Sequence, residues 1–496
     1  MGFKESIDEL LREWGKDETP GVAAAVLRKG EIVYEGFFGL ADSERRSRIG
    51  VDTVFELASV TKPITALAVM LLRERNLLSY ESPLSRFFPE VRSPVVRDIT
   101  VRQLLTHTSA LPEYDELFLN RKILKEKYAP RSIKAGRAAF EPTSEDVLRV
   151  VAELDKLEET PGKQFSYSNT GYALLSQVIA RATKSTYHDF VQQEIFKPFG
   201  MSDSFVFGKE TKPGPNFAVS YDRGWNDFHD IDYTPLNFVS GDGSARSTLA
   251  DMIKLAMGLD AASDPSAVGG PARRIISPST FNEATDVATL VPTDLAKNTY
   301  YGFGWIVSNV RSGARNRKVI WHTGMWTGFK TAFFRVPEEA LTIILLSNIM
   351  QFPPSTVACN IANIFFGDPP SRYPPPAEAE LIRFAKLYSP EQQFNPYDGD
   401  VDVTLEPESE TSPTKILWLK TPELEKFRLT PVRDRGGLTG DFFGKGLEGF
   451  DLFRFSFTTD ATPDPITGDS ARLIAPFSPP RTIRNKRGFR RQQRAS

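Results

Sequence analysis

The apolar positions of the chain follow two patterns, and the β-strand pattern marks both ends of the first 365 residues. Near the N-terminus, two apolar segments, 21–27 and 31–37, flank a short polar turn, as in a β-hairpin. Three further strands are predicted late in this region, at residues 302–307, 331–336 and 341–347. Short apolar segments of this length, bounded by turn residues, are typical of buried strands.

Helical spacing dominates between these strands. Residues 59–75 carry Ile64, Leu67 and Leu71 at intervals of three and four, and Pro63 falls in the first turn, where a missing N–H costs little. Further helices are predicted over an amphipathic N-terminal segment and at residues 100–107, 143–154 and 171–183. Strands at both ends with helices between them indicate an α/β fold whose single sheet joins the two ends of this region.

The pattern changes after a proline-rich segment. A chain of 496 residues is too long for one ordinary core, so two or three domains are expected. Beyond the prolines, short alternating segments predict a small all-β barrel or sandwich, with strands at 401–405, 415–419, 427–431 and 452–457. We therefore expect a large first domain over residues 1–367, a semi-rigid linker over 368–380, and an all-β domain with a basic tail over 381–496.

Charge and cysteine content exclude several classes of protein. A formal net charge of -2 gives no field that would attract nucleic acid or an anionic membrane, and the basic tail from Arg481 to Arg494 is interpreted as a solvated terminus. No stretch of about twenty apolar residues predicts a membrane span, and the N-terminus lacks an unbroken apolar signal segment. The single cysteine, Cys359, excludes an intrachain disulfide, so we expect a cytoplasmic protein.

Three segments have local interpretations of their own. Cys359 lies in an apolar segment and is predicted to be buried. Residues 118–142 are charged and irregular, as in a surface insertion. Residues 208–240 are rich in proline, aspartate and aromatic residues, which fits either a loop that packs its own aromatic side chains or a wall of a substrate pocket.

The candidate chemistry begins with Ser59 and Lys62. A serine three residues before a lysine at the start of an apolar helix places both side chains on one helical face. A lysine among apolar residues has a lowered pKa and can accept a proton from the serine hydroxyl. A second motif, from Tyr167 to Asn169, adds a tyrosine and an amide to a serine-nucleophile set.

These motifs, together with the segment from His322 to Gly324, resemble the serine β-lactamase and penicillin-binding-protein superfamily. The nearest branch is the class C β-lactamase-like group of the peptidase S12 type, which includes D-aminopeptidases, esterases and acyl-transferases. Segments 55–59, 104–112 and 161–172 are similar to signatures of this group. The resemblance covers roughly residues 5–365 and implies an antiparallel sheet flanked by helices plus an all-helical subdomain. The terminal all-β domain resembles the lipocalin-like domain of several peptidases in this group.

The resemblance implies a role for each motif residue. Ser59 would be the acylated nucleophile, Lys62 would share its proton, and Tyr167 would act as general base and then as acid toward the leaving group. Asn169 would hold the substrate carbonyl or amide and orient Lys62. The backbone N–H groups of Ser59 and Met325 would form the oxyanion hole.

The third motif departs from the pattern of penicillin-recognising members. Those proteins carry Lys-Thr-Gly, whose lysine attracts a substrate carboxylate, whereas this chain has His322, Thr323 and Gly324. A mostly neutral imidazole binds a carboxylate more weakly than an ammonium group. The departure argues against β-lactam hydrolysis and favours an ester, amide or peptide substrate.

We therefore predict a serine hydrolase that forms an acyl-enzyme on Ser59, with a small-molecule or short-peptide acyl substrate. Two alternatives stay open: an acyl-transferase that uses the same residues, and a catalytically inactive sensor or scaffold. No cofactor is expected, and the four histidines show no metal-ligand spacing. No nucleic-acid or membrane partner is predicted, and the sequence leaves homo-oligomer formation open.

Overall fold

The computed structural model describes most of the first 366 residues and a set of strands beyond them. The described residues are 2–12, 14–15, 18–114, 117–118, 142–208, 211, 214, 216–223, 228–230, 238–263, 275–287, 290–293, 298–312, 315–326, 328–350, 352–366 and eight strand segments between 386 and 485. The chain divides into two compact units, Met1–Asp368 and Pro369–Ser496. The predicted linker at 368–380 and the predicted surface insertion lie outside the described residues, apart from the insertion's two end positions, 118 and 142.

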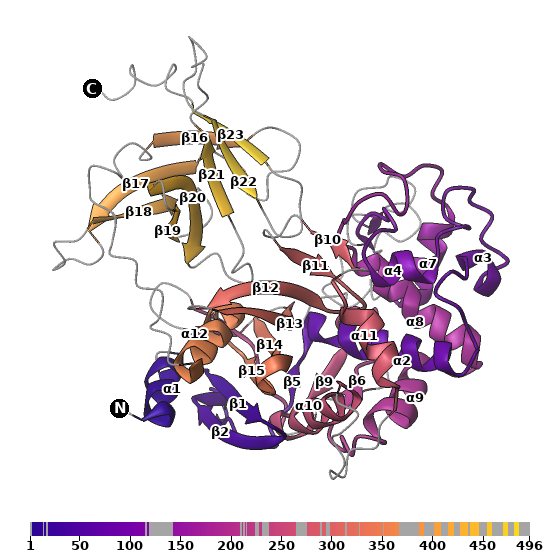
Figure 1. The fold of residues 1–496 in the computed structure, drawn as a ribbon, viewed down its shortest axis with the longest axis horizontal. Helices are drawn as coiled ribbons and strands as arrows, with labels where there is room; N and C mark the ends of the chain where they lie inside the picture. The colour runs from indigo at the N-terminus through magenta and orange to yellow at the C-terminus, as the bar shows by residue number, and fades with distance from the viewer. Residues whose placement is uncertain are drawn as a thin grey trace. The chain divides into compact units, whose positions relative to one another are not determined.

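An eight-stranded antiparallel sheet organises the first unit (Figure 1). Its strand order is β10-β11-β12-β13-β14-β15-β1-β2. The strands are β1 (Val22–Arg28), β2 (Glu31–Phe38), β10 (Val291–Pro292), β11 (Thr299–Tyr301), β12 (Ile306–Ser312), β13 (Arg315–Trp326), β14 (Phe329–Val336) and β15 (Leu341–Ser347). The two ends of the unit meet where β1 pairs with β15, with Ala25 opposite Ile344, which confirms the expected joining of the chain ends.

Helices cover the sheet because its central strands are apolar along their whole length. Every residue of β14 and β15 is buried, and so is all of β1 except its last residue, Arg28. Such strands need cover on both faces. Helices α1 (Phe3–Arg12) and α12 (Pro354–Phe366) pack together against the sheet, and α10 (Leu249–Ser263) contacts β1 and β15. Cys359, on α12, is exposed, so the prediction that it is buried was wrong.

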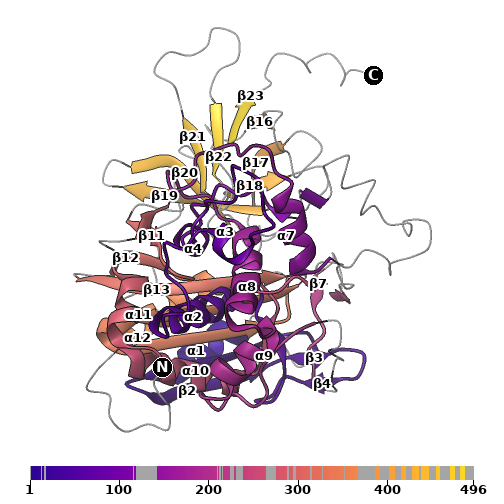
Figure 2. The same cartoon turned by 90° about the vertical axis from the view of Figure 1, so that its right-hand side faces the viewer.

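A group of helices lies beside the sheet and carries two of the motifs (Figure 2). Its members are α2 (Thr61–Glu74), α3 (Leu84–Phe87), α4 (Val101–Leu105), α7 (Ser144–Ala152), α8 (Asn169–Thr183), α9 (Tyr187–Val191) and α11 (Pro278–Thr285). The first twelve residues of α2 are buried, and α8 packs against α2, α4 and α7. The predicted helices are present, and Thr143 caps α7 through a capping box with Asp146.

The strand prediction at 302–307 was partly wrong. Residues 302–305 form a turn between β11 and β12, with Gly304 at a φ of 76°. Strand β13 was not among the predicted strands, because its first half is basic and lacks an apolar run. Short strands β5 (Phe55–Glu56), β6 (Phe205–Val206) and β9 (Ala245–Ser247) form a separate small sheet, and β5 leads directly into the first motif.

The aromatic segment 208–240 is described only in part. Strands β7 (Tyr221–Arg223) and β8 (Phe228–Asp230) pair within it, and the buried Tyr221 hydroxyl accepts a hydrogen bond from the Ser43 N–H. Phe238 stacks on Phe207 with ring centroids 6.0 Å apart. Much of the predicted substrate wall, including Trp225 and Tyr233, lies outside the described residues.

The second unit consists of antiparallel strands. They are β16 (Lys386–Pro390), β17 (Val401–Pro407), β18 (Lys415–Lys420), β19 (Phe427–Asp434), β20 (Gly437–Lys445), β21 (Arg454–Thr458), β22 (Ser470–Ile474) and β23 (Arg481–Asn485). Each strand pairs with the next, and β23 returns to pair with β16, which closes the set into a barrel. The strands predicted at 401, 415, 427 and 452 correspond to β17, β18, β19 and β21.

Candidate active site

Ser59 lies in a 3-10 turn, Ala58–Val60, which leads directly into α2. The preceding residue, Ala58, has a φ of 48°, in the left-handed region that non-glycine residues rarely adopt. The turn is held from two sides: the Leu57 N–H donates to the Ala245 carbonyl, and the Thr331 hydroxyl on β14 donates to the Leu57 carbonyl at 2.8 Å. A strained residue held in this way is typical of a functional site, because the surrounding contacts must maintain it.

Lys62 follows one helical turn later and contacts Ser59, as the motif spacing predicts. Its Nζ lies 3.1 Å from Ser59 Oγ and donates to Asn169 Oδ1 at 2.7 Å and to the Asp242 carbonyl at 3.0 Å. The side chain is fully buried. Burial lowers the pKa of Lys62 to about 8, although the nearby carboxylates of Asp242 and Glu113 act in the opposite direction.

Tyr167 reaches the same hydroxyl from the other motif. Its OH lies 3.1 Å from Ser59 Oγ, and the Lys62 ammonium stands 4.9 Å from the centre of its ring. Burial raises the pKa of the Tyr167 phenol well above its usual value of 10. A tyrosinate in the resting protein, which the expected role as general base requires, is therefore disfavoured. Ser168 caps α8, so the motif ends where a helix begins.

Two carboxylates near Lys62 were not found from the sequence. Asp242 is buried and accepts a hydrogen bond from the Tyr114 hydroxyl at 2.9 Å, while burial raises the pKa of its carboxyl. Glu113 accepts from the Asn169 N–H through both oxygens, at 2.9 and 3.2 Å. The available signals were weak: Glu113 follows a Leu-Pro pair, and Asp242 stands between two glycines.

The third motif lies on β13, beside the Ser59 turn. A Cβ on Gly324 would come within 2.2 Å of the Leu57 carbonyl oxygen, so only glycine allows this close approach. His322 Nδ1 lies 2.7 Å from the Thr323 carbonyl and must donate to it, which leaves Nε2 to accept from the Tyr301 hydroxyl at 3.1 Å. Burial, with the charge of Lys62, lowers the pKa of His322 to about 3, so the imidazole is neutral. Met325 is half-buried beside this motif.

The structure therefore gathers four predicted residues, Ser59, Lys62, Tyr167 and Asn169, through direct hydrogen bonds, and places His322, Thr323, Gly324 and Met325 on the adjoining strand. A serine hydroxyl next to a buried amine and a phenol can act as a nucleophile. Among the residues the structure describes, no group of three or more His, Cys, Asp or Glu side chains could hold a metal ion. Likewise, none of the described helices is long and apolar enough to cross a membrane.

The chain belongs to the Beta-lactamase family, because residues 7–365 match the family model of that description. It is 28% identical over 335 residues to Penicillin-binding protein 4* of Bacillus subtilis (strain 168), covering 64% of this chain and 66% of that protein. It is 35% identical over 225 residues to Esterase EstB of Burkholderia gladioli, covering 44% and 53%. It is 24% identical over 332 residues to a D-aminopeptidase of Cereibacter sphaeroides (strain ATCC 17029 / ATH 2.4.9), covering 66% and 57%. The chain thus spans roughly half to two thirds of the length of these curated relatives.

Solved structures share the fold. The octameric penicillin-binding protein homologue from Pyrococcus abyssi superimposes with a TM-score of 0.63 at 22% identity, covering 97% of this chain and 99% of that one. The D-amino acid amidase from Ochrobactrum anthropi SV3, complexed with L-phenylalanine amide, gives a TM-score of 0.57 at 22% identity, covering 74% and 97%. At this level of identity the similarity concerns the fold alone.

Proposed function

We propose that this protein is a serine hydrolase that forms an acyl-enzyme on Ser59 and releases the acyl group to water. The observation that carries the proposal is the position of Ser59 Oγ, which lies 3.1 Å from both Lys62 Nζ and the Tyr167 hydroxyl. Two groups able to exchange a proton with one serine at the start of a buried helix form the arrangement that nucleophilic catalysis needs.

In the acylation step, the neutral amine of Lys62 takes the proton of Ser59 as Oγ attacks the substrate carbonyl. A bond forms between Oγ and the carbonyl carbon, and the carbonyl electrons move onto its oxygen. The N–H groups of Ser59 and Met325 are assigned to that oxyanion. Collapse of the tetrahedral intermediate breaks the bond to the leaving group, which receives a proton from Tyr167. Lys62 then returns its proton to Tyr167.

This assignment gives Tyr167 the role of proton donor and relay and assigns the role of first base to Lys62. Support comes from burial, which favours the uncharged form of both groups: it lowers the pKa of Lys62 to about 8 and keeps Tyr167 a neutral phenol. Deacylation runs through the same groups, with water in place of the alcohol or amine. The resemblance had favoured Tyr167 as the base, so this is a revision of that hypothesis.

We infer that the substrate is an ester, amide or short peptide without a carboxylate at the third motif. The neutral His322 supplies no cation there, because Tyr301 and the Thr323 carbonyl hold it in one uncharged form. Asn169 is assigned to the substrate amide or carbonyl, and Thr323 with Gly324 to the strand edge that admits it. The names of two relatives, an esterase and a D-aminopeptidase, are consistent with this substrate class.

The test of the proposed function is Ser59→Ala. We expect it to abolish turnover of p-nitrophenyl esters and D- or L-aminoacyl amides, and to abolish labelling by a fluorophosphonate, because no nucleophile remains. Loss of a hydroxyl near a helix start costs about 1 kcal/mol, so the protein should stay folded. Intact-mass spectrometry with a slow ester gives the readout, and an acyl adduct that persists on the Ala variant would assign the nucleophile elsewhere.

The same substrates and probe, applied to the unmodified protein, separate the alternatives. If an added alcohol or amine captures the acyl group faster than water does, the protein is an acyl-transferase. If the unmodified protein shows neither labelling nor turnover, it is a scaffold or sensor.

For the rest of the molecule, we propose that the second unit is a lipocalin-like domain over 381–496 and that the protein is cytoplasmic. We also propose that it forms a homo-oligomer, which the octameric homologue from Pyrococcus abyssi supports.

A further inference from the structure

His107 makes hydrogen bonds on both sides of Tyr167. Its backbone carbonyl accepts from the Ser166 N–H at 2.7 Å, and its Nδ1 accepts from the Ser168 N–H at 3.0 Å. These are the amides of the residues immediately before and after Tyr167. One residue, distant in sequence, thus anchors the backbone on either side of the catalytic tyrosine.

The imidazole of His107 also lies against the Tyr167 ring. The two ring centroids are 4.1 Å apart with an interplanar angle of 32°, whereas the Tyr301 ring meets the imidazole edge-on at 4.4 Å. Because Nδ1 accepts a hydrogen bond and burial lowers the pKa of His107 well below its usual range, the imidazole is neutral with its proton on Nε2. That buried Nε2 has no hydrogen-bond partner among the described residues. A buried polar atom without a hydrogen-bond partner lowers the stability of the folded protein, so stability alone does not account for a histidine here.

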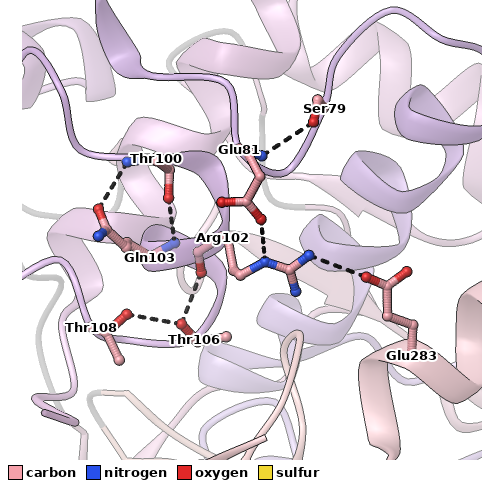
Figure 3. Close-up of polar contacts among 8 residues, drawn as sticks. All are labelled: Ser79, Glu81, Thr100, Arg102, Gln103, Thr106, Thr108 and Glu283. Atoms are coloured by element: carbon pink, nitrogen blue, oxygen red, sulfur yellow. Dashed lines mark hydrogen bonds and ion pairs between the residues drawn. The ribbon is translucent and has the colours of Figure 1, made fainter. Parts of the chain in front are cut away.

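His107 is itself held firmly, as part of the turn that ends α4. Thr100 and Gln103 form a capping box at the start of α4, and the Thr106 hydroxyl donates to the Arg102 carbonyl at 2.8 Å and contacts the Thr108 hydroxyl at 3.0 Å (Figure 3). Arg102 extends from the same helix to Glu283 on α11 at 3.2 Å. His107 follows with a φ of 55°, a left-handed conformation that this network supports.

We propose that His107 is a positioning residue that directs the Tyr167 hydroxyl toward Ser59 Oγ. The inference rests on the proposed function, because it assigns His107 a role only through the proton transfer by Tyr167. The two hydrogen bonds restrict rotation of the backbone that carries Tyr167, and the ring contact restricts its side chain. Without them the hydroxyl can leave the 3.1 Å contact with Ser59, and a displacement of about 1 Å can reduce a catalysed rate by about 10²-fold.

Two variants separate the parts of this role. His107→Ala removes the ring and the Nδ1 acceptor, and we expect kcat to fall by about 10²-fold with little change in KM. His107→Asn tolerates the left-handed backbone and can restore an acceptor for the Ser168 N–H, so its kcat should lie between those of the Ala variant and the unmodified protein. The Asn variant carries the test if the Ala variant does not fold. His188→Asn removes the partly buried imidazole that lies 3.2 Å from the Phe207 carbonyl, and serves as the matched control with near-normal kcat.

A double-mutant cycle with Tyr167→Phe decides whether the effect passes through Tyr167. Tyr167→Phe alone should lower kcat by roughly 10²–10⁴-fold. Once the hydroxyl is gone its position no longer matters, so each His107 substitution should then cost less than about twofold. Equal losses in both backgrounds, or a change in KM alone, would overturn the proposal. A Tyr167→Phe variant with normal kcat would instead contradict the proposed function, so the two failures are distinguishable.

Discussion

At the scale of single residues, burial decides the protonation states around Ser59. Lys62 and His322 are buried and Tyr167 is half-buried, and loss of contact with water favours the uncharged form of each. Two nearby carboxylates, the buried Asp242 and the half-buried Glu113, offset part of this effect on Lys62 and keep its pKa near 8 rather than lower. The site thus holds an amine that can lose its proton close to neutral pH and a phenol that retains its own.

The pH dependence of acylation should follow Lys62. The ammonium form cannot accept the Ser59 proton, so kcat/KM for a neutral ester should rise as pH increases through about 8 and then level off. Lys62→Arg should be inactive throughout, since a guanidinium does not deprotonate in this range. Steady-state kinetics between about pH 6 and pH 10 measures the profile. Full activity of the unmodified protein at the acidic end would show that Lys62 is not the base.

His322 should affect substrate choice through its charge. Because its pKa is near 3, the profile above should contain no second titration in the weakly acidic range. His322→Gln keeps a neutral side chain and should retain most ester hydrolysis. His322→Lys adds a cation at the third motif, which can form a charge-assisted hydrogen bond with the carboxylate of a cephalosporin. The kcat/KM for the cephalosporin should therefore rise relative to that for the neutral ester by roughly ten- to a hundredfold. An equal effect on both substrates would show that charge at this position does not set the substrate class.

At the scale of secondary-structure elements, close backbone contacts place the start of α2 against the sheet. The turn between β11 and β12 lies on the first turn of α2: a Cβ on Gly304 would come within 2.7 Å of the Lys62 carbonyl oxygen and 2.9 Å of Ala66 Cβ. Gly324 makes the corresponding approach from β13 to the Leu57 carbonyl. The distance between Ser59 and the third motif therefore depends on glycines that admit the backbone of α2 and its preceding turn.

Two glycines with matched backbone conformations test this contact. Gly304 and Gly30 have φ values of 76° and 78°, but no atom of the described residues lies within 4 Å of a Cβ on Gly30. Gly30→Ala should cost only the left-handed conformation, about 1–2 kcal/mol, with kcat unchanged. Gly304→Ala should cost more and lower kcat, because Lys62 must move. Denaturant unfolding and steady-state kinetics give the comparison, and equal stability losses with normal kcat in both variants would contradict it.

At the scale of the whole molecule, the sheet makes the first unit depend on both of its ends. Strand β15 lies between β14 and β1, so residues 341–347 complete a core that begins at residue 22. The division at Asp368 leaves this sheet intact within one unit. The second unit closes its own barrel by pairing β16 with β23, and takes no strand from the described part of the first.

Truncation should therefore have opposite outcomes at two nearby positions. A chain that ends at Asp368 should unfold cooperatively and retain fluorophosphonate labelling of Ser59. A chain that ends at Ala340 lacks β15 and α12, which leaves β1 and β14 with an unpaired edge, and should not fold. Circular dichroism melts with parallel labelling provide the readout. Failure of the longer chain to fold would show that the first unit needs the second.

The sequence predicted the parts of this protein that depend on local spacing. The hairpin of β1 and β2 and strand β15 follow from short apolar segments bounded by turn residues. The placement of Ser59 and Lys62 on one helical face follows from their spacing of three residues. The joining of the chain ends followed from the order of strands and helices, because apolar strands at both ends need a common sheet.

Only the tertiary structure decided which distant groups surround that helix. His107 and Glu113 come from the loop after α4, Asp242 from a second loop, and Tyr301 from β11. Their contacts with the motif residues span from 56 to 180 positions along the chain, apart from the Tyr301 contact with His322. No periodic pattern encodes such a contact. The pKa values of Lys62, Tyr167 and His322 depend on burial, which is a property of the packed chain. The family resemblance therefore implied a tyrosine base, whereas burial favours a neutral phenol at Tyr167 and lowers the pKa of Lys62 to about 8.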